Sequence, residues 1–378
     1  MRVGLVAGEA SGDLLAAGLI REIRARVPDA VFEGIAGPAL AGEGCDTWAT
    51  ADTLAVMGLV EPLAHIPRLL RLRRAIARRW RDNPPDVFVG IDAPDFNLGL
   101  EIKLRRFGIR TAHYVSPSIW AWRPRRVHKV AKAADRVLCI LPFEKPIYDA
   151  HGIDAVFVGH PKADLLAGGD DRVAARTELS VTATEVVAVL PGSRMGEVSR
   201  LGDTLAGAAK LLADRRPELR FLTPVASPRL RSLIEGQLAA AGVADRFDLI
   251  AGRSERVMAA ADVVLLASGT AALESALLGK PTVAAYRVSP MTYAIARGLK
   301  LVKLTHYTLP NLLTESPLVP EFIQGAATPE ALAEAVAALL DDPARRELIS
   351  RRFATLRSEL ALNADQRAAE SVIDLARR

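Results

Sequence analysis

Two aspartates that could act as acids or bases follow an apolar run in the stretch "DVFVGIDAPDFN", Asp86–Asn97. Asp92 closes the β-branched run, and Asp95 comes three residues later, beyond a proline. A carboxylate at a strand end can take a proton from a reacting group, cap a helix or hold a loop. Because ligands of open α/β sheets bind beyond the carboxyl ends of the strands, Asp95 is the predicted general base.

The other residues of this turn are expected to shape it. Asp92 is predicted to accept backbone hydrogen bonds and so to hold the loop. Pro94 should keep Ala93 extended, since a proline ring disfavours the helical conformation of the residue before it. Asn97 is the predicted cap of a helix that begins near Leu98.

Two Gly/Ser turns suit the binding of phosphate. "PGSR" (Pro191–Arg194) and "ASGTAALE" (Ala267–Glu274) each follow an apolar run and precede a helix-forming stretch. Backbone N–H groups and the positive end of a helix dipole attract phosphate oxygens at such turns. The alternative for "PGSR" is an ordinary turn with Ser193 as helix cap. The candidate phosphate contacts are Ser193, Arg194, Ser268, Gly269 and Thr270, and the negative charge of Glu274 suits ribose hydroxyls instead.

Two loop motifs in the first half of the chain indicate a function less specifically. "GEASGD" (Gly8–Asp13) is not the G-x-G-x-x-G pattern of dinucleotide-binding folds, which disfavours an NAD site. It suits either a large ligand or a capped helix start, with Ser11 as cap and Asp13 beside the helix dipole. In "HYVSPSIWAWRPRRVHKV" (His113–Val130), tryptophans and arginines could stack on a ligand or pack in the core. His113 is interpreted as a satisfied histidine at a strand end.

Apolar and basic residues alternate between Leu54 and Trp80. An apolar stripe flanked by arginines is typical of a helix that lies on an anionic membrane. An amphipathic surface helix, whose arginines reach past its apolar face into water, gives the same pattern. The candidate membrane-facing residues are Leu63, Ile66, Leu69, Arg71 and Arg74.

Bulk composition limits the class of protein. At 378 residues the chain is long enough for two domains. A net charge of +5, from 49 basic and 44 acidic side chains, is too small to indicate nucleic acid by itself. Two cysteines, Cys45 and Cys139, form no disulfide framework or metal pattern and fit a reducing cytosol. Without a secretory signal or an apolar run of about 18–20 residues, we expect a protein that is soluble or attached to a membrane surface.

Short apolar runs alternate with amphipathic stretches, which predicts an α/β fold with parallel sheets. A Gly/Asp-rich break at Leu165–Arg172 is the candidate linker, after which the pattern restarts. We therefore predict two Rossmann-like domains, residues 1–165 and 166–344, that face each other across a cleft, with helices of residues 345–378 packing back on the first. The expected strands are Arg2–Ala7, Val31–Ile35, Val87–Ile91, Thr111–Val115, Arg136–Leu141, Ala155–Val158, Val186–Leu190, Arg220–Val225, Phe247–Ile250, Asp262–Ala267 and Thr282–Ala285.

Together these motifs resemble those of the lipid-A-disaccharide synthases, glycosyltransferases of Gram-negative lipid A synthesis. The motifs that carry the resemblance run in order from residue 8 to residue 324: "GEASGD", "AVMGLVE", "GIDAPDFN", "YVSPSIWAWR", "LPFEK", "VGHP", "LPGSR", "ASGTAALE", "YTLPNLL" and "EFIQ". The resemblance implies a GT-B fold and transfer of 2,3-diacylglucosamine from UDP to the 6-hydroxyl of 2,3-diacylglucosamine 1-phosphate. The implied products are a β-1,6-linked disaccharide 1-phosphate and UDP, with no cofactor and no bound metal ion.

The resemblance also implies particular contacts. Asn311 and Gln324 are expected to line the nucleotide-sugar site, with Glu274 on the ribose. The expected acceptor-side residues are Glu9, Ser11, Asp13, Tyr114 and Ser116. Such an enzyme is a peripheral protein on the cytoplasmic face of the inner membrane, monomeric or homodimeric, with no nucleic acid partner. The alternatives are another GT-B enzyme, either a glycosyltransferase for a different lipid or a UDP-sugar 2-epimerase, and a non-catalytic nucleotide- or lipid-binding module.

Overall fold

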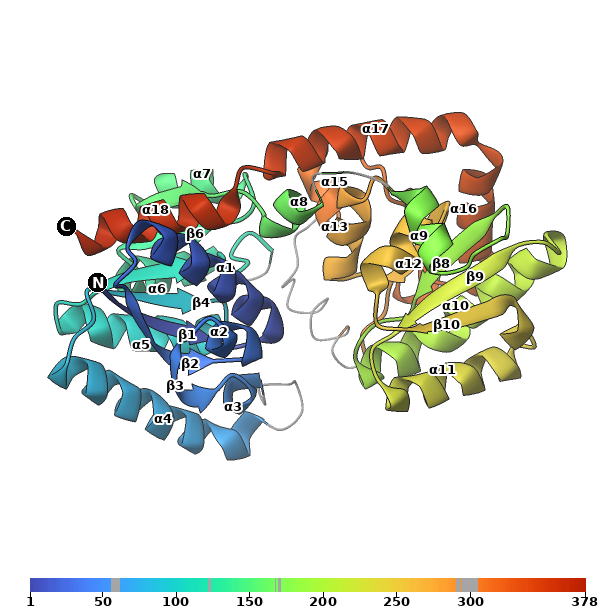
Figure 1. Ribbon diagram of the computed structural model, residues 1–378. Helices are drawn as coiled ribbons and strands as arrows, with labels where there is room; N and C mark the ends of the chain where they lie inside the picture. The colour runs from blue at the N-terminus through green and yellow to red at the C-terminus, as the bar shows by residue number, and fades with distance from the viewer. Residues whose placement is uncertain (56–61, 122–123, 167, 169–170, 290–292, 294–304) are drawn as a thin grey trace. The chain divides into compact units, whose positions relative to one another are not determined.

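The computed structural model describes residues 1–55, 62–121, 124–166, 168, 171–289, 293 and 305–378, and only the backbone of residues 52, 55 and 62–65. The chain forms two compact units (Figure 1). The first unit comprises Met1–Asp164 with Leu360–Arg378, and the second comprises Leu165–Glu359. The boundary thus falls next to the predicted linker, but residues 345–359 belong to the second unit rather than to the segment that returns to the first.

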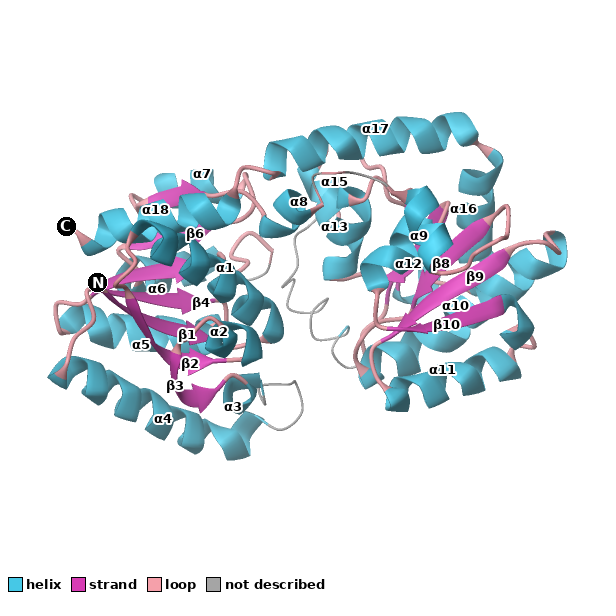
Figure 2. Cartoon of the chain, in the orientation of Figure 1, coloured by secondary structure: helices cyan, strands magenta, loops and turns pink. Residues whose placement is uncertain are grey.

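A parallel sheet of seven strands forms the first unit, in the order β3-β2-β1-β4-β5-β6-β7 (Figure 2). The strand order runs outward in both directions from the neighbours β1 and β4. Ligands of such sheets bind at this switch point, beyond the carboxyl ends of its two strands. The strands are β1 (Arg2–Ala7), β2 (Val31–Ala36), β3 (Asp46–Thr50), β4 (Val87–Ile91), β5 (Arg110–Tyr114), β6 (Arg136–Cys139) and β7 (Ala155–Phe157).

Helices cover both faces of this sheet, because parallel strands need crossover connections. On one face α1 and α18 enclose a core with Val89 and Tyr114; on the other, α4 and α5 enclose a core with Trp80 and Phe88. The helices are α1 (Ala10–Arg26), α2 (Pro38–Gly42), α3 (Asp52–Ala55), α4 (Pro62–Asp82), α5 (Pro94–Arg106), α6 (Val127–Ala133), α7 (Glu144–Asp149), α8 (Pro161–Leu165) and α18 (Ala364–Ala376).

The second unit repeats this design with six parallel strands in the order β10-β9-β8-β11-β12-β13. Its switch point lies between the neighbours β8 and β11. The strands are β8 (Val186–Leu190), β9 (Arg220–Val225), β10 (Phe247–Ala251), β11 (Val263–Ala267), β12 (Thr282–Tyr286) and β13 (Glu321–Ile323). The helices are α9 (Arg172–Glu178), α10 (Met195–Arg215), α11 (Pro228–Ala240), α12 (Ser254–Ala260), α13 (Thr270–Leu277), α15 (Leu309–Leu313), α16 (Pro329–Asp341) and α17 (Pro343–Leu360).

Helix α17 is held to the second unit by side chains that reach the end of α13. The Ser350 hydroxyl donates to the Gly279 carbonyl at 2.7 Å, and Arg357 donates to the Leu277 carbonyl at 2.9 Å. These contacts explain why α17 stays with the second unit while α18 packs on α1 of the first.

Two strands, β3 and β13, are missing from the sequence prediction. Both lie at a sheet edge, and their residues are half-buried or exposed. These two strands therefore lack the continuous apolar run by which the other strands were recognised. The other eleven expected strands are present, with ends that differ by at most two residues.

Candidate active site

The loops after β1 and β4 touch each other at the switch point of the first sheet. Gly8 is buried, and a Cβ atom built on it would overlap the Cβ of Ala93. A Cβ atom on Gly12 would lie 3.3 Å from Cγ2 of Ile91. The two glycines therefore let the "GEASGD" loop pack directly against the "GIDAPDFN" loop, at the edge where ligands of such sheets bind.

The turn after β4 is strained. Asp92 and Ala93 both adopt the left-handed conformation, with φ of 50° and 42°. This conformation costs a non-glycine residue roughly 1–2 kcal/mol, and such residues cluster at functional sites. The expectation that Ala93 is extended is wrong: it is the residue before α5, which begins at Pro94. Proline at the first helical position presets the helix, so the chain turns in two residues.

Asn97 lies inside α5 rather than capping it, because the helix begins four residues earlier than predicted near Leu98. Its side chain is fully buried. Its amide Nδ2 lies within hydrogen-bond distance of the carbonyls of Asp92 (2.8 Å), Val6 (3.3 Å) and Ile91 (3.3 Å). Asn97 thus ties the strained turn to the ends of β1 and β4.

Asp92 is half-buried at the end of β4. Its backbone N–H donates to the Tyr114 carbonyl at 2.9 Å. Burial raises the pKa of the Asp92 carboxyl, while the positive charge of His113 and a hydrogen bond from the Ala93 backbone act in the opposite direction. A carboxylate whose proton affinity is raised by burial is the kind of group that serves as a general base.

Asp95, the predicted base, lies in the first turn of α5 and is exposed. Its Oδ1 is 2.7 Å from Nη2 of Arg126, and the two side chains are 57% and 10% exposed respectively. The Arg73 guanidinium also donates to the Asp95 carbonyl, at 3.4 Å. Asp95 is therefore engaged by a nearly buried arginine at the helix surface.

A buried polar cluster follows β5 and β6. The Ser116 and Tyr148 hydroxyls are 2.8 Å apart, and Glu144 accepts hydrogen bonds from the Leu141 backbone (3.1 Å) and the Trp120 indole (3.2 Å). Burial raises the pKa of Glu144 to about 7. Trp120 is half-buried and packs edge-on against Phe143; Trp122 lies outside the described residues.

The expected acceptor-side residues divide into two groups. Glu9 and Ser11 are exposed at the start of α1, beside the turn after β4. Asp13 is buried and accepts hydrogen bonds from the backbone N–H groups of Gly37 (2.7 Å), Ala39 (2.8 Å) and Leu40 (3.2 Å). Asp13 thus caps α2, so its carboxylate oxygens are occupied by the protein itself.

Tyr114 and Ser116 are buried as well. The Tyr114 ring lies in the core with α1 and α18, and its buried hydroxyl has no hydrogen-bond partner among the described residues. Burial and the carboxylates of Asp365 and Asp164 raise the pKa of this hydroxyl. The structure therefore brings Glu9 and Ser11 to the carboxyl edge near Asp92, and places Tyr114 and Ser116 in the interior.

In the turn after β8, a carboxylate of the same chain binds the backbone N–H groups. Glu197 accepts hydrogen bonds from the backbone N–H groups of Ser193 (3.2 Å) and Arg194 (3.4 Å). Gly192 has φ of 117°, and a Cβ there would lie 2.6 Å from Glu197 Oε2, so glycine is required. Arg194, rather than Ser193, precedes the helix α10, and its side chain is exposed. Sequence reasoning missed Glu197, although its place three residues after the cap is a known signal.

The turn after β11 is adjacent, since β8 and β11 are paired. The Ser268 N–H donates to the Ala285 carbonyl at 2.7 Å, while Gly269 and Thr270 are exposed at the start of α13. Glu274 is half-buried in the second turn of this helix. The residues predicted for phosphate and ribose thus lie on neighbouring turns at the second switch point.

Asn311 and Gln324 bind their own chain. The Asn311 Nδ2 group donates to the Val319 carbonyl (2.8 Å) and to Glu321 (2.9 Å), and its Oδ1 accepts from the N–H groups of Leu318 and Val319. The Gln324 amide pairs with both backbone groups of Val288, at 2.7 and 3.3 Å. Gln324 therefore braces the chain just beyond the carboxyl ends of β12 and β13, whereas Asn311 braces the segment that leads into the amino end of β13.

Glu321 accepts several hydrogen bonds from neighbouring segments of its own chain and was not identified from the sequence. Its carboxylate accepts hydrogen bonds from the N–H groups of Tyr307 and Thr308 and from the Thr308 hydroxyl, at 2.7–3.0 Å, in addition to Asn311. It is the first residue of the motif "EFIQ" and of β13, a strand that the sequence analysis did not predict.

Helix α4 is amphipathic. Its buried side chains include Leu69, Ile76 and Trp80, while Ile66 is 41% exposed and Arg71 and Arg74 are exposed. The side chain of Leu63 and most of the motif "AVMGLVE" lie outside the described residues. Within the part of the chain that is described, no helix is both long and apolar enough to cross a membrane.

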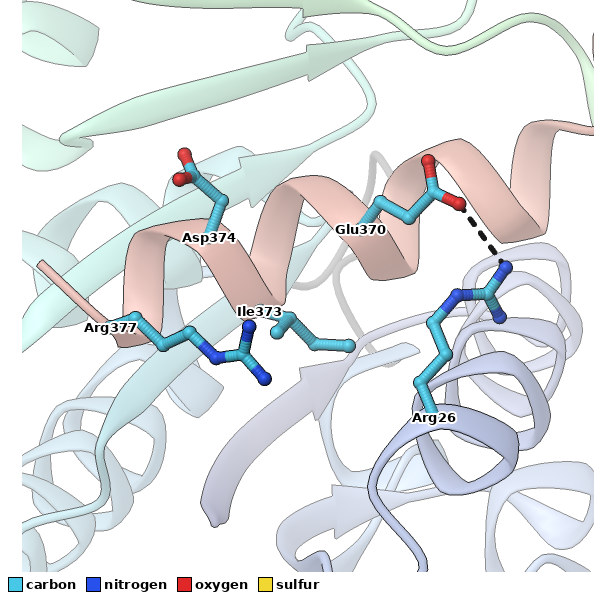
Figure 3. A pocket seen from close by; sticks show the side chains of 5 residues that line it. All are labelled: Arg26, Glu370, Ile373, Asp374 and Arg377. Carbon is cyan, nitrogen blue, oxygen red and sulfur yellow. Dashed lines mark hydrogen bonds and ion pairs between the residues drawn. The ribbon is translucent and has the colours of Figure 1, made fainter.

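A cavity of about 360 Å³ lies away from these turns, at the last turn of α1 and along α18. It is lined by Arg26, Glu370, Ile373, Asp374 and Arg377, and Figure 3 shows Arg26 reaching Glu370. Because α1 runs away from the carboxyl edge, this cavity is separate from the turns described above. Among the described residues no group of three or more His, Cys, Asp and Glu side chains is arranged to hold a metal ion.

The fold is shared with the solved structures of a sugar-nucleotide epimerase and a glycotransferase. The chain is similar to a UDP-GlcNAc 2-epimerase from Neisseria meningitidis bound to UDP-GlcNAc (TM-score 0.63, 14% identity, 99% of this chain and 100% of that one). It is similar to the glycotransferase of kitacinnamycin (TM-score 0.63, 18% identity, 99% and 98% covered). Two parallel-sheet α/β units with these neighbours define the class of GT-B proteins.

Sequence comparison defines the family. The model of the lipid-A-disaccharide synthetase family matches residues 3–372. The chain is 50% identical to the lipid-A-disaccharide synthase of Xanthomonas campestris pv. campestris (strain 8004), over 99% of this chain and 86% of that protein. It is 49% identical to that of Alkalilimnicola ehrlichii, over 99% and 98%. The chain belongs to the lipid-A-disaccharide synthase family and is a glycosyltransferase of lipid A synthesis, as its motifs predicted.

Proposed function

We propose that this enzyme joins 2,3-diacylglucosamine, carried by UDP, to the 6-hydroxyl of 2,3-diacylglucosamine 1-phosphate, with Asp92 as the general base. The acceptor oxygen attacks the anomeric carbon, the bond from that carbon to the UDP oxygen breaks, and UDP leaves with the bonding electrons. The hydroxyl proton passes to the Asp92 carboxylate, and the anomeric centre inverts. No second, proton-donating carboxyl is needed, because UDP leaves as an anion.

The observation that carries this assignment is the placement of Asp92. It is half-buried in a strained turn at the switch point, and its pKa is raised by burial. Asp95 was the prediction from sequence, but its exposed carboxylate is already paired with Arg126. The ion pair holds the Asp95 carboxylate against the surface of α5, whereas Asp92 lies in the turn at the switch point, so Asp92 suits the reaction better. We propose that Asp95, in the first turn of α5, serves to hold the side chain of Arg126.

For the donor, we propose that the UDP diphosphate binds at the turns after β8 and β11, with Arg194, Ser268, Gly269 and Thr270 as contacts. The exposed guanidinium of Arg194 offers a charged fork for diphosphate oxygens. Glu274 is assigned to the ribose hydroxyls. For the acceptor we retain Glu9 and Ser11, which are exposed beside the Asp92 turn. Asp13, Tyr114, Ser116, Asn311 and Gln324 are assigned to positioning the loops.

The test compares Asp92→Asn with Asp95→Asn in an assay that measures disaccharide formation from the two substrates. Asp92→Asn should lower kcat by roughly 100- to 10,000-fold with little change in the donor KM, as expected for loss of a general base. Asp95→Asn loses one partly exposed ion pair and should keep activity within about tenfold. If Asp95→Asn loses as much activity as expected for Asp92→Asn, and Asp92→Asn stays active, the two roles are reversed.

Both lipid substrates require access to a membrane. We propose that α4 attaches the enzyme peripherally to the cytoplasmic face of that membrane. The exposed Ile66 and the exposed Arg71 and Arg74 supply apolar and cationic contacts, at about 1 kcal/mol per arginine near an anionic surface. The variant Arg71→Gln/Arg74→Gln should co-sediment more weakly with phosphatidylglycerol vesicles. Val31→Ser, which changes an exposed apolar residue of β2, is the control. Equal sedimentation of the double variant and the wild type contradicts this attachment.

A further inference from the structure

One glutamate of the second unit engages the groups on which the proposed diphosphate site depends. The Oε2 atom of Glu197 accepts hydrogen bonds from the backbone N–H groups of Ser193 (3.2 Å) and Arg194 (3.4 Å). The other carboxylate oxygen, Oε1, lies 3.5 Å from Nη1 of Arg194. A single carboxylate thus engages both the backbone and the guanidinium of the turn after β8.

The turn provides a place that fits an anionic oxygen. Gly192 has φ of 117°, and a Cβ atom on it would lie 2.6 Å from Glu197 Oε2. This place is bounded by a residue without a side chain and by two N–H groups at the start of α10, where the helix dipole favours negative charge. A phosphate oxygen of the donor has the same requirements as the carboxylate oxygen, and one place cannot hold both at once.

Glu197 is held loosely in this place. Charge-assisted N–H···O hydrogen bonds are usually about 2.7–2.9 Å long. The two bonds to Glu197 are longer than this, and both end on the same oxygen. The side chains of Arg194 and Glu197 are 75% and 35% exposed, so water screens their ion pair. Displacing the carboxylate from the turn therefore requires little free energy.

We propose that Glu197 is a displaceable competitor of the donor diphosphate. Its carboxylate releases the N–H groups of Ser193 and Arg194 when the diphosphate binds, and it binds them again when UDP leaves. The inference rests on the proposed binding of UDP at this turn. It assigns Glu197 to the release of the product rather than to the step that forms the glycosidic bond.

The charge of the ligand decides how strongly Glu197 opposes it. In the donor the terminal phosphate is esterified to the sugar, whereas in UDP it is free and has a second ionisation with a pKa of about 6. UDP therefore carries roughly one more negative charge than the donor at neutral pH. Because repulsion grows with charge, the carboxylate opposes UDP more than the donor and so favours exchange of product for new substrate.

The experiment measures UDP binding by titration calorimetry for the wild type, Glu197→Gln, Arg194→Gln and Asp203→Asn. Glutamine keeps an acceptor oxygen for the two N–H groups but removes the charge. UDP should therefore bind Glu197→Gln roughly 5- to 30-fold more tightly, the size expected when a like charge about 4 Å away is removed. Asp203→Asn is the matched control, since it removes the same charge from an exposed residue further along α10 and should change Kd by less than about twofold.

The outcomes separate the two proposals. If Arg194→Gln binds UDP as tightly as the wild type does, the diphosphate site itself is wrong and the inference fails with it. If Arg194→Gln binds UDP more weakly but Glu197→Gln does not bind it more tightly, the role of Glu197 is overturned while the site stands. A glutamate that only caps α10 would change the free energy of unfolding and leave UDP binding unchanged or weaker.

Product inhibition of disaccharide formation gives a second measurement. In Glu197→Gln the inhibition constant of UDP should fall by a larger factor than the donor KM, because the additional charge of UDP is what the carboxylate opposes. Glu197→Ala, which lacks the acceptor oxygen as well, should show the same order of effects. Equal factors for UDP and the donor in both variants would contradict a role in product release.

Discussion

The close approach of Gly8 to Ala93 gives a prediction that joins stability to catalysis. In Gly8→Ala the new Cβ would overlap that of Ala93, well inside the carbon–carbon contact distance of about 3.5–4.0 Å. Relief requires the loops after β1 and β4 to move apart, and overpacking of this kind costs about 1–3 kcal/mol of the free energy of unfolding. Since these loops carry Glu9, Ser11 and Asp92, kcat should fall by roughly 10- to 100-fold.

The matched variant is Ala93→Gly. It removes the Cβ atom that the new side chain of Gly8→Ala would overlap. It also replaces an alanine in the left-handed conformation, which should stabilise the fold by about 1–2 kcal/mol, while the greater backbone entropy of glycine in the unfolded chain costs about 0.5–1 kcal/mol. In the double variant the next contacts of the new Cβ lie at 3.7 Å, to Cδ1 of Leu54, and at 3.8 Å, to Cα of residue 93, which are ordinary distances. The double variant should therefore be about as stable as Ala93→Gly alone, with an interaction energy of about 1–3 kcal/mol.

Urea unfolding followed by tryptophan fluorescence measures this cycle. All four tryptophans lie in the first unit, in the stretch from Trp48 to Trp122, so the signal reports that unit. Disaccharide formation by the same four proteins gives the catalytic half, and kcat should recover in the double variant. If the two single effects simply add, the loops do not touch as described, and the reasoning that joins them into one site is refuted.

Three further variants test the interior contacts. Asp13→Asn replaces the carboxylate that accepts hydrogen bonds from three backbone N–H groups, and it should destabilise the first unit by about 2–3 kcal/mol in the fluorescence assay. Unchanged stability would contradict this capping role and would return Asp13 to the candidates for contact with the acceptor substrate. Burial raises the pKa of Asp365 to about 6, above its unfolded value near 3.8, so stability from this group is present below pH 4 and lost as the pH rises through 6. Asp365→Asn should remove that loss and gain about 1–2 kcal/mol at pH 7.5, where an equal or lower stability contradicts the burial argument. Asn311→Ala should destabilise the second unit by about 2–4 kcal/mol in calorimetry, whereas a raised donor KM with unchanged unfolding would assign Asn311 to the ligand.

The sequence placed the candidate motifs at the ends of strands, but it did not specify what their side chains contact. Motifs such as "GEASGD" and "GIDAPDFN" were placed at strand ends because strands and turns follow from local periodicity. The roles of their side chains depend on partners that are distant in the sequence. Asp13 accepts hydrogen bonds from the backbone of Gly37 and Ala39, and Asp95 forms an ion pair with Arg126. Such pairings join residues 24 to 31 positions apart, and no local pattern specifies them.

By itself, then, the sequence determined the α/β class, eleven of the strands, the division near residue 165 and the family, because these depend on periodicity, turn chemistry and order of motifs. Tertiary structure decided which of Asp92 and Asp95 is half-buried, which of the polar side chains are occupied by their own chain, and that the buried side chains of His113 and Glu101 lie within hydrogen-bond distance of each other. The physical reason is that burial and charge pairing arise only when the sheet brings α5, β4 and β5 together. Proton affinity is a property of that environment and not of the residue alone.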